Sequence, residues 1–163
     1  MGRTARTSGT LRPAKSVAAN QIRPQRLTTS RTSVEEAAFV RCSMDPSVNV
    51  LGTELEPCSQ DPLTGWYRDG CCNTDDNDHG SHTVCCVLND DFLEFARDMG
   101  NDLITPAPRF NFPGLKAGDS WCVCARTWLL AVNAGKACPV DLEATHQRAL
   151  DIIPLDVLET HAL

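Results

Sequence analysis

Hydrophobic residues in the middle of the chain follow two different periods. Residues 82–89, HTVCCVLN, form a run of β-branched and small apolar residues that is typical of a buried strand. In residues 90–99 the apolar side chains instead recur three and four positions apart, as in an amphipathic helix. Asn89 can cap the start of this helix and Gly100 can end it. The pattern therefore predicts a strand followed directly by a capped helix.

Strand and helix continue to alternate towards the C-terminus. Residues 121–134, WCVCARTWLLAVNA, predict a strand that runs into a helix closed by Gly135, and residues 139–145 predict a third strand. Two short helical segments follow at 146–153 and 154–162. Few strands with short connections favour a small two-layer α+β sandwich, in which helices cover one face of a few-stranded sheet.

A long polar segment precedes these elements. After a short predicted strand at Val48–Leu51, residues 53–82 are rich in turn-forming steps such as Asp-Pro, Thr-Gly and Asp-Gly. Structureless loops of this length are uncommon in small domains and tend to be functional or pinned. We therefore expect the functional site to involve residues 53–82.

Charge divides the chain into two parts. Residues 1–34 carry +7 and the whole chain −6, so the remainder carries −13. A basic, Ser/Thr-rich, acid-poor N-terminus is typical of organelle transit peptides, and VRCS at 40–43 resembles the processing motif of algal plastid precursors. We expect a disordered transit peptide over 1–42 and one globular domain over 43–163, located in the chloroplast stroma or alternatively the mitochondrial matrix. A disordered basic tail that binds an acidic partner or nucleic acid is the other interpretation.

The acidic remainder also limits the partners. Affinity for a phosphate backbone comes from Lys and Arg, so we expect no nucleic-acid binding. No segment approaches the roughly twenty apolar residues of a membrane span, so we expect no membrane partner. A small-molecule or protein partner stays unidentified.

Four cysteines and two histidines stand within RDGCCNTDDNDHGSHTVCC, residues 68–86. A domain of this size should fold without cross-links, and cysteines in a reducing compartment are more often ligands, redox thiols or core residues than disulfides. Zinc is a possible cofactor, although no pair has the spacing of a standard zinc knuckle. The candidate metal ligands are Cys71, Cys72, His82, Cys85, Cys122 and Cys124.

A reactive thiol is the second interpretation of these cysteines. It requires a nearby cation, imidazole or helix N-terminus, and His82 is close enough in sequence to serve Cys72 or Cys85. These three are the candidate catalytic residues of a metal-binding, redox or thiol-dependent protein. The third interpretation is a non-catalytic acidic interaction module whose cysteines only pack.

The loop cysteines are expected to fold back onto the sheet. Cys71 or Cys72 should lie within a few ångströms of one of the strand cysteines, with His82 at the rim. The acidic run Asp75–Asp78 should stay in water, because burying unpaired carboxylates is costly. The strand cysteines in question are Cys85, Cys122 and Cys124.

Two polar pairs complete the candidates. Arg68 and Asp69 could clamp a ligand or stabilise a turn at the surface. Glu143 and His146 could do acid–base chemistry, or they could belong to a helix cap with Thr145 as the N-cap residue.

Several longer motifs resemble those of a known family. The segments LEPCSQDPLTGWYRDGCC, GSHTVCCV, FLEFARDMGNDLITPAPRFNFPGLKAGDSWCVCA and LEATHQRAL are similar to domain of unknown function 2237, from about Asn49 to the C-terminus. The resemblance implies a compact α+β fold, chiefly bacterial in distribution, and no established activity, so the question of an enzyme stays open. In this family pattern Cys86 and Cys138 do not occupy motif positions. Those that do are Cys58, Cys71, Cys72, His82, Cys85, Cys122, Cys124 and His146.

Overall fold

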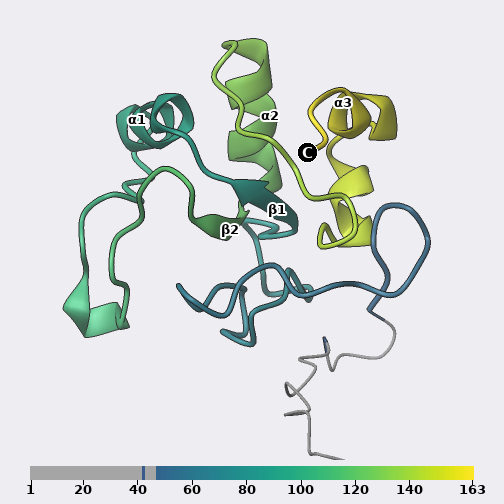
Figure 1. Cartoon of the computed structure of the whole chain (residues 1–163), viewed down its shortest axis with the longest axis horizontal. Coiled ribbons are helices and arrows are strands. Elements are labelled where there is room, and N and C mark those ends of the chain that lie inside the picture. The colour runs from purple at the N-terminus through teal and green to yellow at the C-terminus, as the bar shows by residue number, and fades with distance from the viewer. Residues whose placement is uncertain (1–41, 43–46) are drawn as a thin grey trace, which may run out of the picture. The chain divides into compact units, whose positions relative to one another are not determined.

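Strands β1 and β2 form a small antiparallel sheet with helices on one face. The computed structural model describes Cys42 and residues 47–163. Helices α1, α2 and α3 lie on one side of the sheet, and the long loop before β1 passes under the other side (Figure 1). The predicted small α+β fold is therefore confirmed. In chain order the elements are β1 (Val84–Val87), α1 (Asp90–Asp98), the 3-10 helix η1 (Pro108–Phe110), β2 (Ser120–Val123), α2 (Ala125–Asn133), the 3-10 helix η2 (Gln147–Asp151) and α3 (Leu155–Thr160).

The register of the sheet assigns its side chains to two separate clusters. Cys85 lies opposite Cys122 in the antiparallel ladder, and both belong to a small cluster beside the loop. Their neighbours along the strands point the other way, because successive side chains of a strand alternate between its faces. Val84, Cys86 and Val123 accordingly belong to the main core with the helices.

The helices begin where the sequence predicts. The side chain of Asn89 accepts a 2.8 Å hydrogen bond from the backbone N–H of Phe92, which caps α1. α2 follows β2 after the single residue Cys124, and its Trp128 is fully buried and donates to the carbonyl of Cys138 at 3.0 Å. Burial of large side chains such as this indole supplies most of the stabilisation of short helices.

Two predicted strands are wrong, and both fail for the same reason. Residues 48–51 and 139–145 form only isolated bridges. In the first, the side chain of Asn49 accepts hydrogen bonds from the N–H groups of Leu51 and Thr53. In the second, Asp141 accepts from the N–H groups at positions 143 and 144. A side chain that binds nearby backbone groups offers an alternative to a sheet ladder.

Three disulfides fasten the long loop, which corrects the expectation that these cysteines are ligands, redox thiols or core residues rather than structural bridges. The loop has few buried apolar side chains, so packing alone gives it little to hold it in place. The disulfides join Cys42 to Cys71, Cys58 to Cys85 and Cys72 to Cys122. The first includes the last residue of the expected transit peptide, the rest of which lies outside the described residues.

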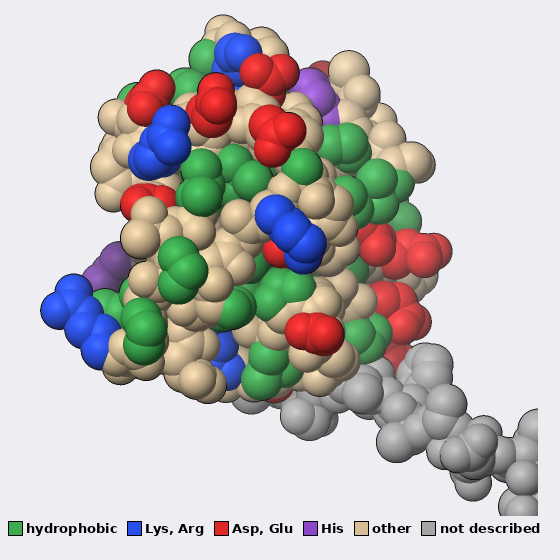
Figure 2. Space-filling view, turned by 60° about the vertical axis from the view of Figure 1, so that its left-hand side comes forward, with side chains coloured by type: hydrophobic (Ala, Val, Ile, Leu, Met, Phe, Trp, Pro, Cys, Tyr) green, Lys and Arg blue, Asp and Glu red, His purple; other side chains and the backbone are tan. Residues whose placement is uncertain are grey.

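The surface shows no extended apolar region on the face drawn in Figure 2, where apolar side chains are dispersed among charged ones. Within the described part of the chain, no helix has both the length and the apolar character needed to cross a membrane.

The Cys42–Cys71 disulfide yields a stability prediction. The bond closes a loop with a sequence separation of 29, and loss of such a cross-link costs about 3–4 kcal/mol in the chain-entropy treatment. Cys42→Ser should lower the free energy of unfolding by about that amount in urea without reductant. Cys138→Ala, which removes a buried thiol outside any disulfide, controls for the loss of a sulfur. Equal stability of Cys42→Ser and the parent chain would contradict the assignment.

Candidate functional site

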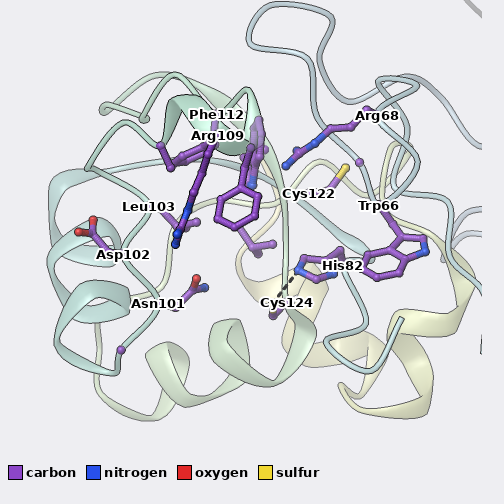
Figure 3. A pocket seen from close by; sticks show the side chains of 16 residues that line it. Trp66, Arg68, His82, Asn101, Asp102, Leu103, Arg109, Phe112, Cys122 and Cys124 are labelled. Carbon is purple, nitrogen blue, oxygen red and sulfur yellow. Dashed lines mark hydrogen bonds between the residues drawn. The ribbon is translucent and has the colours of Figure 1, made fainter. Parts of the chain in front are cut away.

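The sheet register brings an imidazole and a free thiol together. Val84 pairs with Val123, so residues just before β1 lie opposite residues just after β2. His82 and Cys124 occupy these places. The Nε2 atom of His82 is 3.2 Å from Sγ of Cys124 (Figure 3), within the range of a hydrogen bond to sulfur.

A buried carboxylate holds the other side of the imidazole. Asp78 Oδ1 is 2.7 Å from Nδ1 of His82, while Oδ2 accepts from the backbone N–H of His82 at 2.8 Å and from the hydroxyl of Thr74 at 2.9 Å. The expectation that Asp78 stays in water is wrong, because these three contacts replace its hydration. Burial opposes the charge, but the hydrogen bonds from His82 prevail and hold the pKa of Asp78 below its ordinary value.

The charge of His82 is strongly stabilised. The hydrogen bond to Cys124 has the largest effect and raises the pKa of His82. Burial lowers this pKa and Asp78 raises it, and the result is a rise from 6.5 to about 9. The ring of Trp66 stacks on the imidazole with centroids 5.8 Å apart and an interplanar angle of 14°. His82 is therefore a cation that faces a sulfur atom on one side and a carboxylate on the other.

The backbone before β1 is shaped to allow this approach. A Cβ atom at Gly80 would lie only 2.7 Å from Cε1 of His82 and 3.2 Å from Sγ of Cys124. The carbonyl of Ser81 accepts a 2.9 Å hydrogen bond from the N–H of Ala125, which ties the segment to the residue after Cys124. Only glycine leaves room at position 80 for the imidazole and the thiol to meet.

Cys124 is the N-cap residue of α2. No side chain caps this helix end, and the first backbone N–H groups of a helix lack partners within it. These N–H groups and the helix dipole favour negative charge near the sulfur.

A cleft of about 800 Å³ opens beside this thiol. Figure 3 shows His82 and Trp66 on one side of it and Leu103 and Arg109 on the other. Its volume falls in the range of small-molecule sites. The lining side chains include those of Trp66, Arg68, His82, Asn101, Asp102, Leu103, Arg109, Phe110, Phe112, Trp121, Cys122 and Cys124.

The neighbouring cysteine cluster is a separate feature. Cys85 and Cys122 face each other across the ladder, so their two disulfides lie side by side. The sulfur atoms of Cys58, Cys72 and Cys85 all lie within 4.8 Å of one another, and no other such group of potential ligands occurs in the described residues. A soft metal ion could bridge these sulfurs only as thiolates, that is, after reduction of the disulfides.

The predicted convergence of loop and strand cysteines is confirmed by the Cys72–Cys122 disulfide. Of the proposed catalytic trio, however, Cys72 and Cys85 are both in disulfides, and His82 contacts Cys124 instead. Cys71 is bonded to Cys42.

The other polar candidates have separate roles. Arg68 lies over the ring of Trp121 at 5.0 Å, whereas Asp69 accepts from the backbone N–H of Cys71 at 3.0 Å, so these neighbours do not act as a pair. His146, rather than Thr145, is the N-cap of η2 and accepts from the N–H of Arg148. Burial lowers the pKa of His146. Glu143 is exposed.

Sequence reasoning missed Asp78, and it gave Cys124 as a metal ligand or a packing thiol but not as a nucleophile. One available signal was the position of Cys124 between a predicted strand and a predicted helix, since a thiol at a helix N-terminus is a recognised reactive environment. Another was the i, i+4 spacing of Asp78 and His82.

The comparison with known families covers the residues of the site. Residues 48–162 match the model of a family described as an uncharacterized protein conserved in bacteria, DUF2237. The chain belongs to this family. No curated protein matches it. The DUF2237 segment contains the whole site, from the disulfide cysteines Cys58 and Cys72 to His82 and Cys124.

The contact of His82 with Cys124 predicts a measurable titration. Because the hydrogen bond to sulfur is the largest cause, Cys124→Ser should lower the pKa of His82 from about 9 towards 6.5, and by more than Asp78→Asn does. The ring resonances of His82 followed by NMR against pH give this value directly. An unchanged pKa in Cys124→Ser would contradict the contact. Protonated His82 stabilises the fold fully below pH 6.5, and this contribution is lost as the pH rises through about 9.

Proposed function

We propose that this protein acts through Cys124 as a nucleophilic thiol, with His82 and Asp78 as its acid–base partners. The observation that carries the proposal is the connected series of contacts from sulfur to imidazole, 3.2 Å, and from imidazole to buried carboxylate, 2.7 Å, at the wall of a cleft. A nucleophile, a base and a group that orients the base form the arrangement that nucleophilic cysteine enzymes use.

Each residue then has a defined part in the chemistry. Asp78 stays ionised and accepts a hydrogen bond from Nδ1–H of His82, which orients Nε2 towards Cys124; the proton of the thiol resides on Nε2, so that His82 is an imidazolium and Cys124 a thiolate. The resulting thiolate forms a bond to an electrophilic carbon or sulfur of the ligand, and the bond to the leaving group breaks with its electron pair. The leaving group receives the proton from Nε2 of His82. The first turn of α2 stabilises the negative sulfur before the attack.

The remaining free cysteines do not compete for this role. Cys86 and Cys138 are both 0% exposed, and burial raises the pKa of Cys86 well above its ordinary value. Cys124 is thus the free cysteine that a solute can reach from the cleft.

Alkylation kinetics test the proposal. At pH 7 without reductant, iodoacetamide should label Cys124 alone, as located by mass spectrometry. His82→Gln should slow the labelling by about ten-fold or more, because the thiolate loses its cationic partner. His79→Gln, at an exposed neighbour, is the matched control and should react like the parent chain. Equal rates in His82→Gln and the parent chain would refute the proposal.

A second candidate function is metal binding by Cys58, Cys72 and Cys85, whose sulfur atoms lie within 4.8 Å of one another. In this proposal, reduction of the disulfides by a dithiol frees Cys58, Cys72 and Cys85 to bind a soft divalent metal such as zinc.

Cobalt titration tests this second candidate. After anaerobic reduction, the full chain should bind Co²⁺ stoichiometrically with the absorption bands of thiolate coordination, whereas the oxidised chain should not. Cys85→Ser should weaken binding by at least about ten-fold, because it removes a ligand. Cys138→Ser, at a buried cysteine outside the cluster, should bind like the parent chain. Absence of thiolate bands from the reduced chain would dismiss the metal site.

A further inference from the structure

Two guanidinium groups at the cleft have no carboxylate partner among the described residues. Arg68 and Arg109 both line the cleft, and neither forms an ion pair with any residue that the structure describes. Arg148, by contrast, pairs with Asp76 and Asp151. Arg97 and Arg126 likewise form no ion pair with a described residue, so Arg68 and Arg109 are distinguished by lining the same cleft in a part of the chain with net charge −13.

Aromatic rings support both arginines. The guanidinium of Arg68 lies 5.0 Å from the ring centre of Trp121, and that of Arg109 lies 4.6 Å from the ring centre of Phe110. Figure 3 shows the two side chains extending from opposite sides of the cleft. Stacking on a ring limits the orientations of a guanidinium group while leaving its N–H donors available.

The backbone places Arg68 at a conformational cost. Its φ of 56° lies in the left-handed region, which is unfavourable for a residue with a long side chain. This conformation belongs to the same turn as the buried Gly70 and directs the Arg68 side chain towards Trp121 and the cleft.

The charge balance of the cleft is positive. Its lining arginines are Arg68 and Arg109; the charge of protonated His82 is offset by Asp78 at 2.7 Å, and Asp102 is the one acidic lining residue. Asp102 Oδ1 already accepts hydrogen bonds from the backbone N–H groups of Ile104 and Thr105, both at 2.9 Å. The cleft therefore attracts anions although the domain around it is acidic.

We propose that the cleft binds a small aromatic or apolar molecule with an anionic oxygen group, which Arg68 and Arg109 hold while the electrophilic atom lies beside Cys124. This inference rests on the proposed nucleophilic role of Cys124 and adds the class of ligand. Carboxylate and phosphate share the required chemistry, since each can accept paired N–H donors from a guanidinium group. The walls formed by Trp66, Trp121 and Phe112 suit the apolar part of the molecule.

Two aromatic disulfides that differ in charge provide the test. Dithiobis(nitrobenzoate) carries carboxylates, and dithiodipyridine is neutral. With either reagent the Cys124 thiolate attacks one sulfur, a protein–reagent disulfide forms, the reagent's S–S bond breaks, and the second half leaves as a thiolate or thione. The full chain with its disulfides intact is used, and the released chromophore gives the rate.

The measured quantity is the rate with the anionic reagent divided by the rate with the neutral one. Arg68→Gln and Arg109→Gln should each lower this ratio by about three- to ten-fold, because a charge-assisted contact with the carboxylate is lost. Arg126→Gln is the matched control: it removes a cation two residues from Cys124 that does not line this cleft. Its ratio should equal that of the parent chain. An unchanged ratio in both cleft variants, or an equal decrease in Arg126→Gln, would overturn the proposal.

A binding measurement separates failure of the ligand site from failure of the thiol. In Cys124→Ser, NMR should show benzoate or phenyl phosphate shifting the indole N–H signals of Trp66 and Trp121, and benzyl alcohol should do so far less. The anion that binds more tightly shows whether the cleft prefers a carboxylate or a phosphate. Binding by neither anion would overturn the anion site even if Cys124 is reactive, whereas anion binding with an unreactive Cys124 would overturn only the nucleophilic role.

Discussion

The pairing of β1 with β2 in one register is the constraint on which the rest of the structure depends. With Cys85 opposite Cys122, two loop cysteines are bonded to one face of the sheet, while Val84 and Val123 pack against the helices on the other. The same register places the segment before β1 beside the start of α2. A shift by one residue would turn every side chain to the opposite face and would separate His82 from Cys124.

The periodicity of apolar residues was sufficient to predict the helices and the two strands that pack in the core. The 82–89 run and the strand-to-helix pattern at 121–134 are close to the observed β1, β2 and α2, because buried apolar side chains decide these elements. Pattern reading failed at 48–51 and 139–145, where Asn49 and Asp141 bind their own backbone neighbours. The spacing of apolar residues gives no information about side chains that compete with a sheet for backbone hydrogen bonds. It also does not show which strands pair, and the pairing of β1 with β2 is what brings His82 to Cys124.

The expected reducing compartment and the size of the domain both predicted free thiols, so the disulfides were not expected. A domain of this length can fold without cross-links, but its loop cannot be held by packing when few of its side chains are apolar. Four of the six cysteines that fasten the loop are at most 2% exposed, namely Cys71, Cys72, Cys85 and Cys122, whereas Cys42 is 9% exposed and Cys58 is partly exposed. Since thiol–disulfide exchange needs access for the attacking thiolate, such bonds can persist where exposed ones would be reduced.

The disulfides support the proposed chemistry because they hold the loop that carries Asp78. This carboxylate lies in a segment without helix or strand, yet a catalytic carboxylate must be held close to its productive geometry. Cys71 and Cys72 anchor the chain shortly before it, and β1 begins shortly after it. Between these fixed points, the hydrogen bonds from Thr74 and from the backbone of His82 leave Asp78 little freedom. Six cysteines therefore serve rigidity, and their disulfides let an irregular loop orient the imidazole that faces Cys124.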